Sequence, residues 1–135
     1  MTVQVLVATM GQTDHSLLDK MNIQTDVIVG NQCDRNEIEE FEYNGHRVLW
    51  LSFSERGVGL NRNNALMRSQ ADICILADDD MVFVDGYEKI VLSAFESNAD
   101  MDVAIFNLPP DDKKSTSEKK KVGKLNYMRY GAARV

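Results

Sequence analysis

Short apolar runs recur along the chain, and most of them are rich in valine and isoleucine. Because these runs are mostly continuous and do not alternate with polar residues, they predict strands that are covered on both faces, as in a parallel sheet. The predicted strands cover residues 3–8, 27–29, 48–51, 73–77 and 103–106.

Apolar residues at helical spacing fill the gaps between these strands. The patterns predict helices over residues 86–98, 59–70 and 14–21, the last with Thr13 or Asp14 placed to cap its start. Strands that alternate with helices are typical of βαβ units. The sequence therefore predicts an α/β fold, with an open, mostly parallel sheet flanked by helices.

Composition and charge narrow the class of partner. The chain of 135 residues is long enough for one domain, and its formal charge of −6 argues against nucleic-acid binding, which needs a basic face. Cys33 and Cys74 show neither a paired motif nor metal-ligand spacing, which indicates a reducing compartment. No apolar stretch is long enough to predict a transmembrane segment. We expect a cytoplasmic protein and leave peripheral attachment to a membrane open.

The sequence changes character after Leu108-Pro109-Pro110. Residues 109–124 are mostly charged, which predicts a mobile loop whose Lys119-Lys120-Lys121 run is solvated, although contact with phosphates stays open. Residues 125–135 regain apolar content and end like a strand cut short. We therefore expect residues 1–108 to form the first half of a domain, and the chain to be an N-terminal fragment.

Three consecutive carboxylates, Asp78-Asp79-Asp80, directly follow the predicted strand over residues 73–77. Neighbouring negative charges repel one another, so a cation is expected to offset them. Carboxylate oxygens suit Mg²⁺ or Mn²⁺, and Mg²⁺ is usually held by one or two carboxylates together with substrate phosphates. The triplet predicts a metal-bound phosphate ester as ligand, while a plain solvated acidic turn remains the alternative.

Other polar residues follow the ends of neighbouring predicted strands. In open α/β sheets the ligand lies outside the carboxyl ends of the strands. Thr9 ends the first strand, and Asn31 and Asp34 follow the second, where they could pair with a base or ribose or only form a turn. Arg62, on the helix before the acidic strand, could bind a phosphate or bridge surface acids.

Two stretches of sequence together resemble a known family. The stretch Gly57-Val58-Gly59-Leu60-Asn61-Arg62-Asn63-Asn64-Ala65-Leu66, followed by Ala71-Asp72-Ile73-Cys74-Ile75-Leu76-Ala77-Asp78-Asp79-Asp80, resembles family-2 glycosyltransferases of the GT-A fold. Those proteins carry an Arg-Asn pair that opens a helix, then a buried strand that ends in an Asp-x-Asp metal motif. The resemblance covers most of residues 3–108 and implies a nucleotide-sugar-binding half of a GT-A domain.

The resemblance implies roles for individual residues. Asp78 and Asp80 would be the metal ligands, with Asp78 shared between the metal and the ribose. The residues expected to bind the nucleotide-sugar, from the resemblance and from their places at the strand ends, are Thr9, Asn31, Asp34, Arg62, Asp78 and Asp79. The turn Thr9-Met10-Gly11-Gln12 departs from the family, which usually has proline and asparagine there, so the base of the nucleotide is open.

The implied reaction is metal-dependent transfer of a sugar from a nucleoside diphosphate to a hydroxyl, with inversion, as in polysaccharide biosynthesis. UDP- or dTDP-sugar is the expected donor, and a saccharide or lipid-linked molecule the expected acceptor. The family's catalytic base lies beyond the Asp-x-Asp motif, in the second half of the domain. We therefore assign no catalytic residue, and expect the chain alone to bind the donor weakly and turn it over little.

Two alternatives differ in class. The fold could serve as a nucleotide-sugar-binding module that catalyses nothing. The spacing of Asp78 and Asp80 after an apolar strand also suits a haloacid-dehalogenase-like phosphatase, with Asp78 as nucleophile. That arrangement normally opens its domain, whereas here it lies past the middle of the chain.

Overall fold

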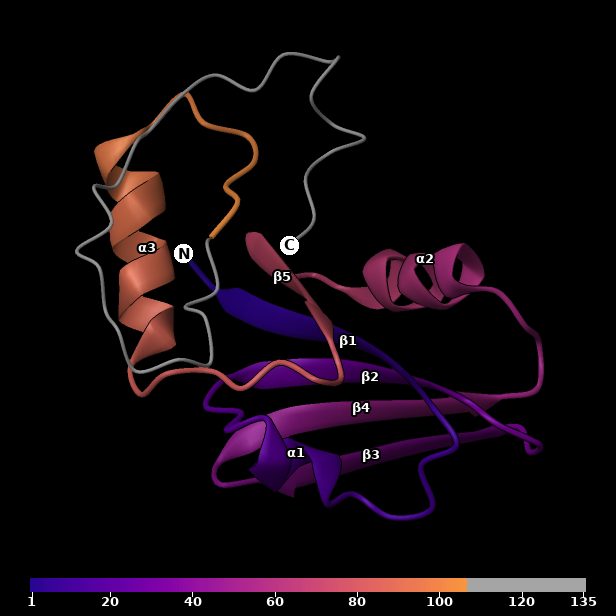
Figure 1. Ribbon diagram of the computed structural model, residues 1–135. Helices are drawn as coiled ribbons and strands as arrows, with labels where there is room; N and C mark the ends of the chain where they lie inside the picture. Colours follow the sequence, from indigo (N-terminus) through magenta and orange to yellow (C-terminus); the bar gives the residue numbers. More distant parts are fainter. Residues whose placement is uncertain (107–135) are drawn as a thin grey trace, which may run out of the picture. The chain divides into compact units, whose positions relative to one another are not determined.

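The computed structural model describes residues 1–106. They belong to two units, Met1–Ser97 and a second that begins at Asn98, and all helices and strands described below lie in the first. In chain order these are β1 (Val3–Met10), α1 (Leu17–Lys20), β2 (Asp26–Gln32), β3 (Glu37–Tyr43), β4 (His46–Phe53), α2 (Val58–Arg68), β5 (Ile73–Asp78) and α3 (Tyr87–Ser97) (Figure 1).

The strands form one mixed sheet in the order β3-β4-β2-β1-β5. The pairings β1–β2, β1–β5 and β2–β4 are parallel, and β3 pairs antiparallel with β4. The predicted α/β class is thus confirmed, and so is the mainly parallel character of the sheet. Because β1, β2, β4 and β5 run in the same direction, their carboxyl ends meet at one end of the sheet.

Strand β3 was not expected from the apolar runs. Glu39, Phe41 and Tyr43 are its half-buried positions, whereas Ile38 lies on the other face and is exposed. A tight turn at Asn44-Gly45 joins β3 to β4. Both turn residues have positive φ, 48° at Asn44 and 81° at Gly45, which is the conformation of a two-residue hairpin turn. The alternation suits an edge strand that is covered on one face only.

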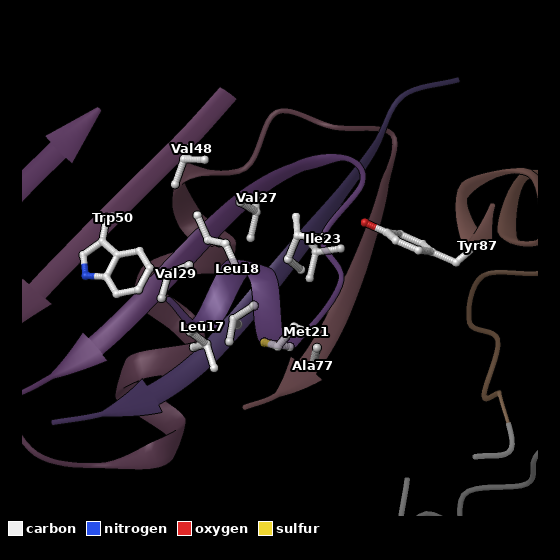
Figure 2. Packing of buried hydrophobic residues seen from close by; sticks show 12 residues of the cluster. Leu17, Leu18, Met21, Ile23, Val27, Val29, Val48, Trp50, Ala77 and Tyr87 are labelled. Carbon is white, nitrogen blue, oxygen red and sulfur yellow. The ribbon is translucent and has the colours of Figure 1, made fainter. Parts of the chain in front are cut away.

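The two faces of the sheet bury different cores. Figure 2 shows the larger one, in which residues of α1 pack against valines of the sheet, with Trp50 and Tyr87 of α3 at opposite ends of the cluster in this view. On the opposite face α2 packs through Ala65 against Leu6, Ile28 and Leu51. Alternation along each strand divides these residues between the faces, since successive side chains point to opposite sides. Helices therefore cover both faces, as the continuous apolar runs predicted.

Several predicted bounds differ from the structure. Helix α1 is shorter than the predicted helix over residues 14–21, and α2 and α3 lie within one or two residues of their predicted ranges. The predicted strand over 103–106 is wrong, because these residues form neither helix nor strand and no described strand pairs with them. An apolar run becomes a strand only where a neighbour completes its hydrogen bonds. The predictions for residues 109–124 and 125–135 lie outside the described residues.

Candidate functional site

A row of polar residues crosses the carboxyl ends of the four parallel strands, on the face covered by α1. Ser52 of β4 is paired in register with Asn31 of β2, and Asn31 with Thr9 of β1. Asp79 directly follows β5, next to Thr9. The side chains of Ser52, Asn31 and Thr9 are buried, and Asn31 is 0% exposed. Buried polar groups require hydrogen-bond partners, so this row needs a connected network.

The turn after β1 supplies much of that network through Gln12. The Gln12 backbone N–H donates to Asn31 Oδ1 at 3.0 Å, and Asn31 Nδ2 donates to the Gln12 carbonyl at 3.0 Å. Asn31 Nδ2 also lies 3.3 Å from Ser52 Oγ, and an Arg35 N–H reaches the Gln12 carbonyl at 3.4 Å. The Asn31 side chain thus holds the turn after β1 against the ends of β2 and β4.

A second set of hydrogen bonds connects this turn to the acidic triplet. Thr9 Oγ1 donates to Asp79 Oδ2 at 2.8 Å, and Gln12 Nε2 donates to Thr9 Oγ1 at 3.0 Å. The carboxylate of Asp79 is therefore bonded to the end of β1.

The neighbouring carboxylate, Asp78, lies on the other face of the sheet. It faces α2, where an Arg62 Nη2–H donates to Asp78 Oδ1 at 2.5 Å. Both side chains are about half exposed, 45% for Arg62 and 52% for Asp78, so the ion pair is accessible to water and to ligands. Strand alternation explains the division, because successive side chains at a strand end point to opposite faces.

Helix α2 is attached to the same end of the sheet by Asn61. Asn61 Nδ2 donates to the carbonyls of Gly30 at 2.9 Å and of Thr9 at 3.3 Å. A side chain at position 30 would collide with it, because a Cβ there would lie 1.8 Å from Asn61 Oδ1. Gly30 thus allows the amide to approach, and Asn61 holds the first turn of α2, with Arg62, at the strand ends.

The structure brings together most of the residues predicted from the sequence. Thr9, Asn31 and Asp79 belong to one network on the α1 face. Asp78 pairs with Arg62 of α2 on the other face of the same sheet end. Asp80 follows them and is exposed, with no hydrogen bond or ion pair among the described residues.

Asp34 differs from this group. Its side chain is exposed, and within residues 1–106 it has no polar partner. The structure therefore places it after β2 but does not connect it to the network.

Sequence reasoning missed Gln12, Ser52 and Asn61. Their positions in the sequence could have indicated them. Gln12 and Ser52 are polar residues near the ends of apolar strands, and Asn61 is a polar residue at the start of the helix that covers the sheet. Gln12 was named only as part of a turn that departs from the family resemblance. Its role depends on the register of β1 and β2, which apolar runs do not determine.

The triplet can be compared with what a metal requires. In the described part of the chain, no group of three or more His, Cys, Asp or Glu side chains is arranged to hold a metal ion. The residues present are nevertheless hard oxygen donors, and Mg²⁺ commonly takes one or two protein carboxylates and completes its shell with phosphate and water. Asp78 and Asp80 carry donors of this type.

A groove of about 630 Å³ lies away from these residues, at the amino ends of the parallel strands. Its lining mixes Arg47 and Arg68 with Glu40 and Glu42 over a floor that includes Ile28. This mixture of charges does not single out a ligand. We therefore base the candidate site on the carboxyl ends, where the polar side chains are specifically connected.

Comparison with known proteins found no matching family model, no matching curated protein and no matching solved structure. The family resemblance therefore remains a hypothesis that rests on residues of this chain. Among the described residues, none of the helices has the length and apolar content needed to cross a membrane.

Proposed function

We propose that this chain is the nucleotide-sugar-binding part of a metal-dependent glycosyltransferase of the GT-A type. One observation carries the proposal. The acidic triplet at the end of β5 lies beside a cation on one face, through Arg62 and Asp78, and beside a buried polar network on the other, through Thr9 and Asp79. A phosphate-bearing ligand with a polar nucleoside needs both kinds of surface.

Each residue has a chemical task in this proposal. Asp78 and Asp80 would hold Mg²⁺ or Mn²⁺, and the Arg62 guanidinium would bind a phosphate oxygen of the donor. Thr9, Asn31 and Asp79 support the surface that receives the nucleoside, and Asp34 would complete it from the turn after β2. When bound, the metal ion supplies Lewis-acid stabilisation of the negative charge on the departing diphosphate.

The proposed reaction transfers a sugar from a UDP- or dTDP-sugar to a hydroxyl of a saccharide or lipid-linked acceptor, with inversion. Deprotonation of that hydroxyl requires a general base, and we assign this task to no described residue. The proposed contribution of residues 1–97 is to bind and orient the donor. This placement of the reacting groups is itself a large part of catalysis.

The test is calorimetric titration of the chain with UDP, dTDP and GDP, each with and without Mn²⁺. We expect nucleotide binding that depends on the metal, and its loss, by about tenfold or more in affinity, in Asp80→Ala. Glu96→Ala is the matched control, since it removes an exposed carboxylate from α3. Absence of binding by every nucleotide, or equal binding by wild type and Asp80→Ala, would overturn the proposal.

A further inference from the structure

The network at the end of β1 determines which way the Gln12 amide points. The Thr9 hydroxyl has one proton, and it donates this proton to Asp79 Oδ2 at 2.8 Å, because a carboxylate only accepts. Thr9 Oγ1 can therefore only accept from its other neighbour, Gln12, at 3.0 Å. The Gln12 nitrogen must face Thr9, and so its carbonyl oxygen, Oε1, must face away.

The Oε1 atom is an available acceptor. It has no hydrogen-bond partner among the described residues, and it is not among the side-chain oxygens that are sealed from solvent without one. The backbone of Gln12 is fixed at the same time by Asn31, on both its N–H and its carbonyl. An acceptor held at both its backbone and its amide nitrogen is pre-organised for a ligand donor.

Arg35 brings hydrogen-bond donors to the same turn, at the backbone of Gln12. The Arg35 guanidinium contacts the Gln12 carbonyl at 3.4 Å, while its Nε lies 3.5 Å from a Glu37 carboxylate oxygen. The remaining N–H groups of a guanidinium can donate to a ligand carbonyl. Gln12 thus carries an available side-chain acceptor, and its backbone carbonyl is in contact with a guanidinium that has further donors.

We propose that Gln12 Oε1 reads the base of the bound nucleotide and selects an imide, the N–H group between two carbonyls that uracil and thymine carry. Such a ring N–H donates to Oε1, and an adjacent carbonyl accepts from Arg35. In cytosine the same ring nitrogen is an acceptor, which would face Oε1 without a proton between them. This inference rests on the proposed function and adds the residue that distinguishes uracil and thymine from cytosine.

The experiment compares UDP with CDP, which share the ribose, the diphosphate and the ring size. The chain is titrated with each nucleotide in the presence of Mn²⁺. We expect wild type to bind UDP about tenfold more tightly than CDP. With CDP one hydrogen bond is lost, and the ring nitrogen and Oε1, both acceptors, face each other. Gln12→Met, which has nearly the same shape but no amide, should weaken UDP binding and bring the ratio of the two affinities close to one.

Two further variants separate base reading from a structural effect. Gln12→Glu keeps an acceptor but loses the N–H that Thr9 Oγ1 accepts, so it should retain a smaller preference for UDP than wild type, whereas Gln12→Met should retain none. Gln70→Met makes the same change at an exposed glutamine after α2 and should leave the ratio unchanged. A general loss of folding would weaken both nucleotides alike and would not move the ratio.

The outcomes separate this inference from the proposed function. Equal affinities of wild type for UDP and CDP, both lost in Asp80→Ala, would overturn base reading by Gln12 and leave the nucleotide-sugar site intact. A UDP preference that Gln12→Met keeps would also overturn it. Failure of both nucleotides to bind would overturn the proposed function, and this inference with it.

Discussion

The two ends of the β1–β5 pair carry the same kind of contact for different purposes. At the amino end, Asp72 accepts from the Thr2 backbone N–H at 2.8 Å and from the Thr2 hydroxyl at 3.1 Å, and the Asp72 N–H donates back to Thr2 Oγ1. At the carboxyl end, Thr9 donates to Asp79. In both contacts the threonine belongs to β1 or precedes it, and the aspartate adjoins β5.

The difference lies in what surrounds each pair. The Thr2–Asp72 pair is closed, because each residue satisfies the other and no further polar side chain joins them in the described structure. The Thr9–Asp79 pair is open, because it continues through Gln12 to Asn31 and adjoins the exposed Asp78 and Asp80. A threonine–aspartate pair that only links two strands therefore differs from one that supports a candidate site in whether further polar side chains are hydrogen-bonded to it.

The largest effect should come from Asn31→Leu, which removes the central amide of the open end. The change removes the Asn31 partner of the Gln12 N–H, the Gln12 carbonyl and the Ser52 hydroxyl, of which the carbonyl keeps its contact with Arg35. Asn31 is 0% exposed. We expect a loss of about 2–4 kcal/mol in the free energy of unfolding, measured by urea denaturation. Asn63→Leu, at an exposed position on α2, is the control. Equal stability of the Asn31 variant and wild type would show that the network does not hold the strand ends together.

A matched pair of variants tests the distinction between the two ends directly. Thr9→Val and Thr2→Val each remove one hydroxyl and keep the shape of the side chain. We expect each to lower the free energy of unfolding by about 1 kcal/mol. Only Thr9→Val should also weaken UDP binding, by roughly tenfold, because it removes the hydrogen bonds that Thr9 Oγ1 makes with Asp79 and with Gln12. If both variants weakened UDP binding equally, the two ends would not differ in function.

The smallest expected effect is on the stability of the protein at low pH. The hydrogen bonds from the Thr2 backbone N–H and hydroxyl lower the pKa of Asp72 below its ordinary value of 3.8. The folded state therefore gains stability from this group above that value and loses it as the pH falls through the lowered pKa. Between about pH 5 and about pH 2, wild type should lose more stability than Asp72→Asn, as measured by urea denaturation. Parallel losses in the two proteins would show that the closed pair contributes nothing to acid sensitivity.

The sequence predicted the parallel part of the fold because burial on both faces leaves continuous apolar runs. It did not reveal β3, in which only Phe41 and Tyr43 are apolar on the covered face and Ile38 lies exposed on the other. The Asn44-Gly45 dipeptide was the local signal of its hairpin. For residues 103–106 the apolar run predicted a strand that does not form. Hydrophobicity alone does not provide a neighbouring strand for its hydrogen bonds.

The acidic residues of the candidate site could be predicted from the sequence, but their hydrogen-bond and ion-pair partners mostly could not. Asp78 and Arg62 were expected near the same ligand, and they form an ion pair. The separation of Asp78 and Asp79 onto opposite faces follows from strand alternation, but the partner of each depends on the register between strands. The sequence could not predict that Gln12 Oε1 is an available acceptor. The orientation of the Gln12 amide follows from the hydrogen bond that Thr9 donates to Asp79, which only the structure shows.

The Thr9–Asp79 hydrogen bond joins residues that are 70 positions apart in the chain. The β3–β4 hairpin, by contrast, is closed by a turn of two residues. Because long-range pairings must first overcome the entropy of loop closure, the hairpin can form early, and β5 joins β1 only when most of the chain is in place. We therefore expect Asp79 to reach Thr9 late in folding, whereas Arg62 and Asp78 are only 16 positions apart and can pair earlier. The proposed site would be complete only after the late step.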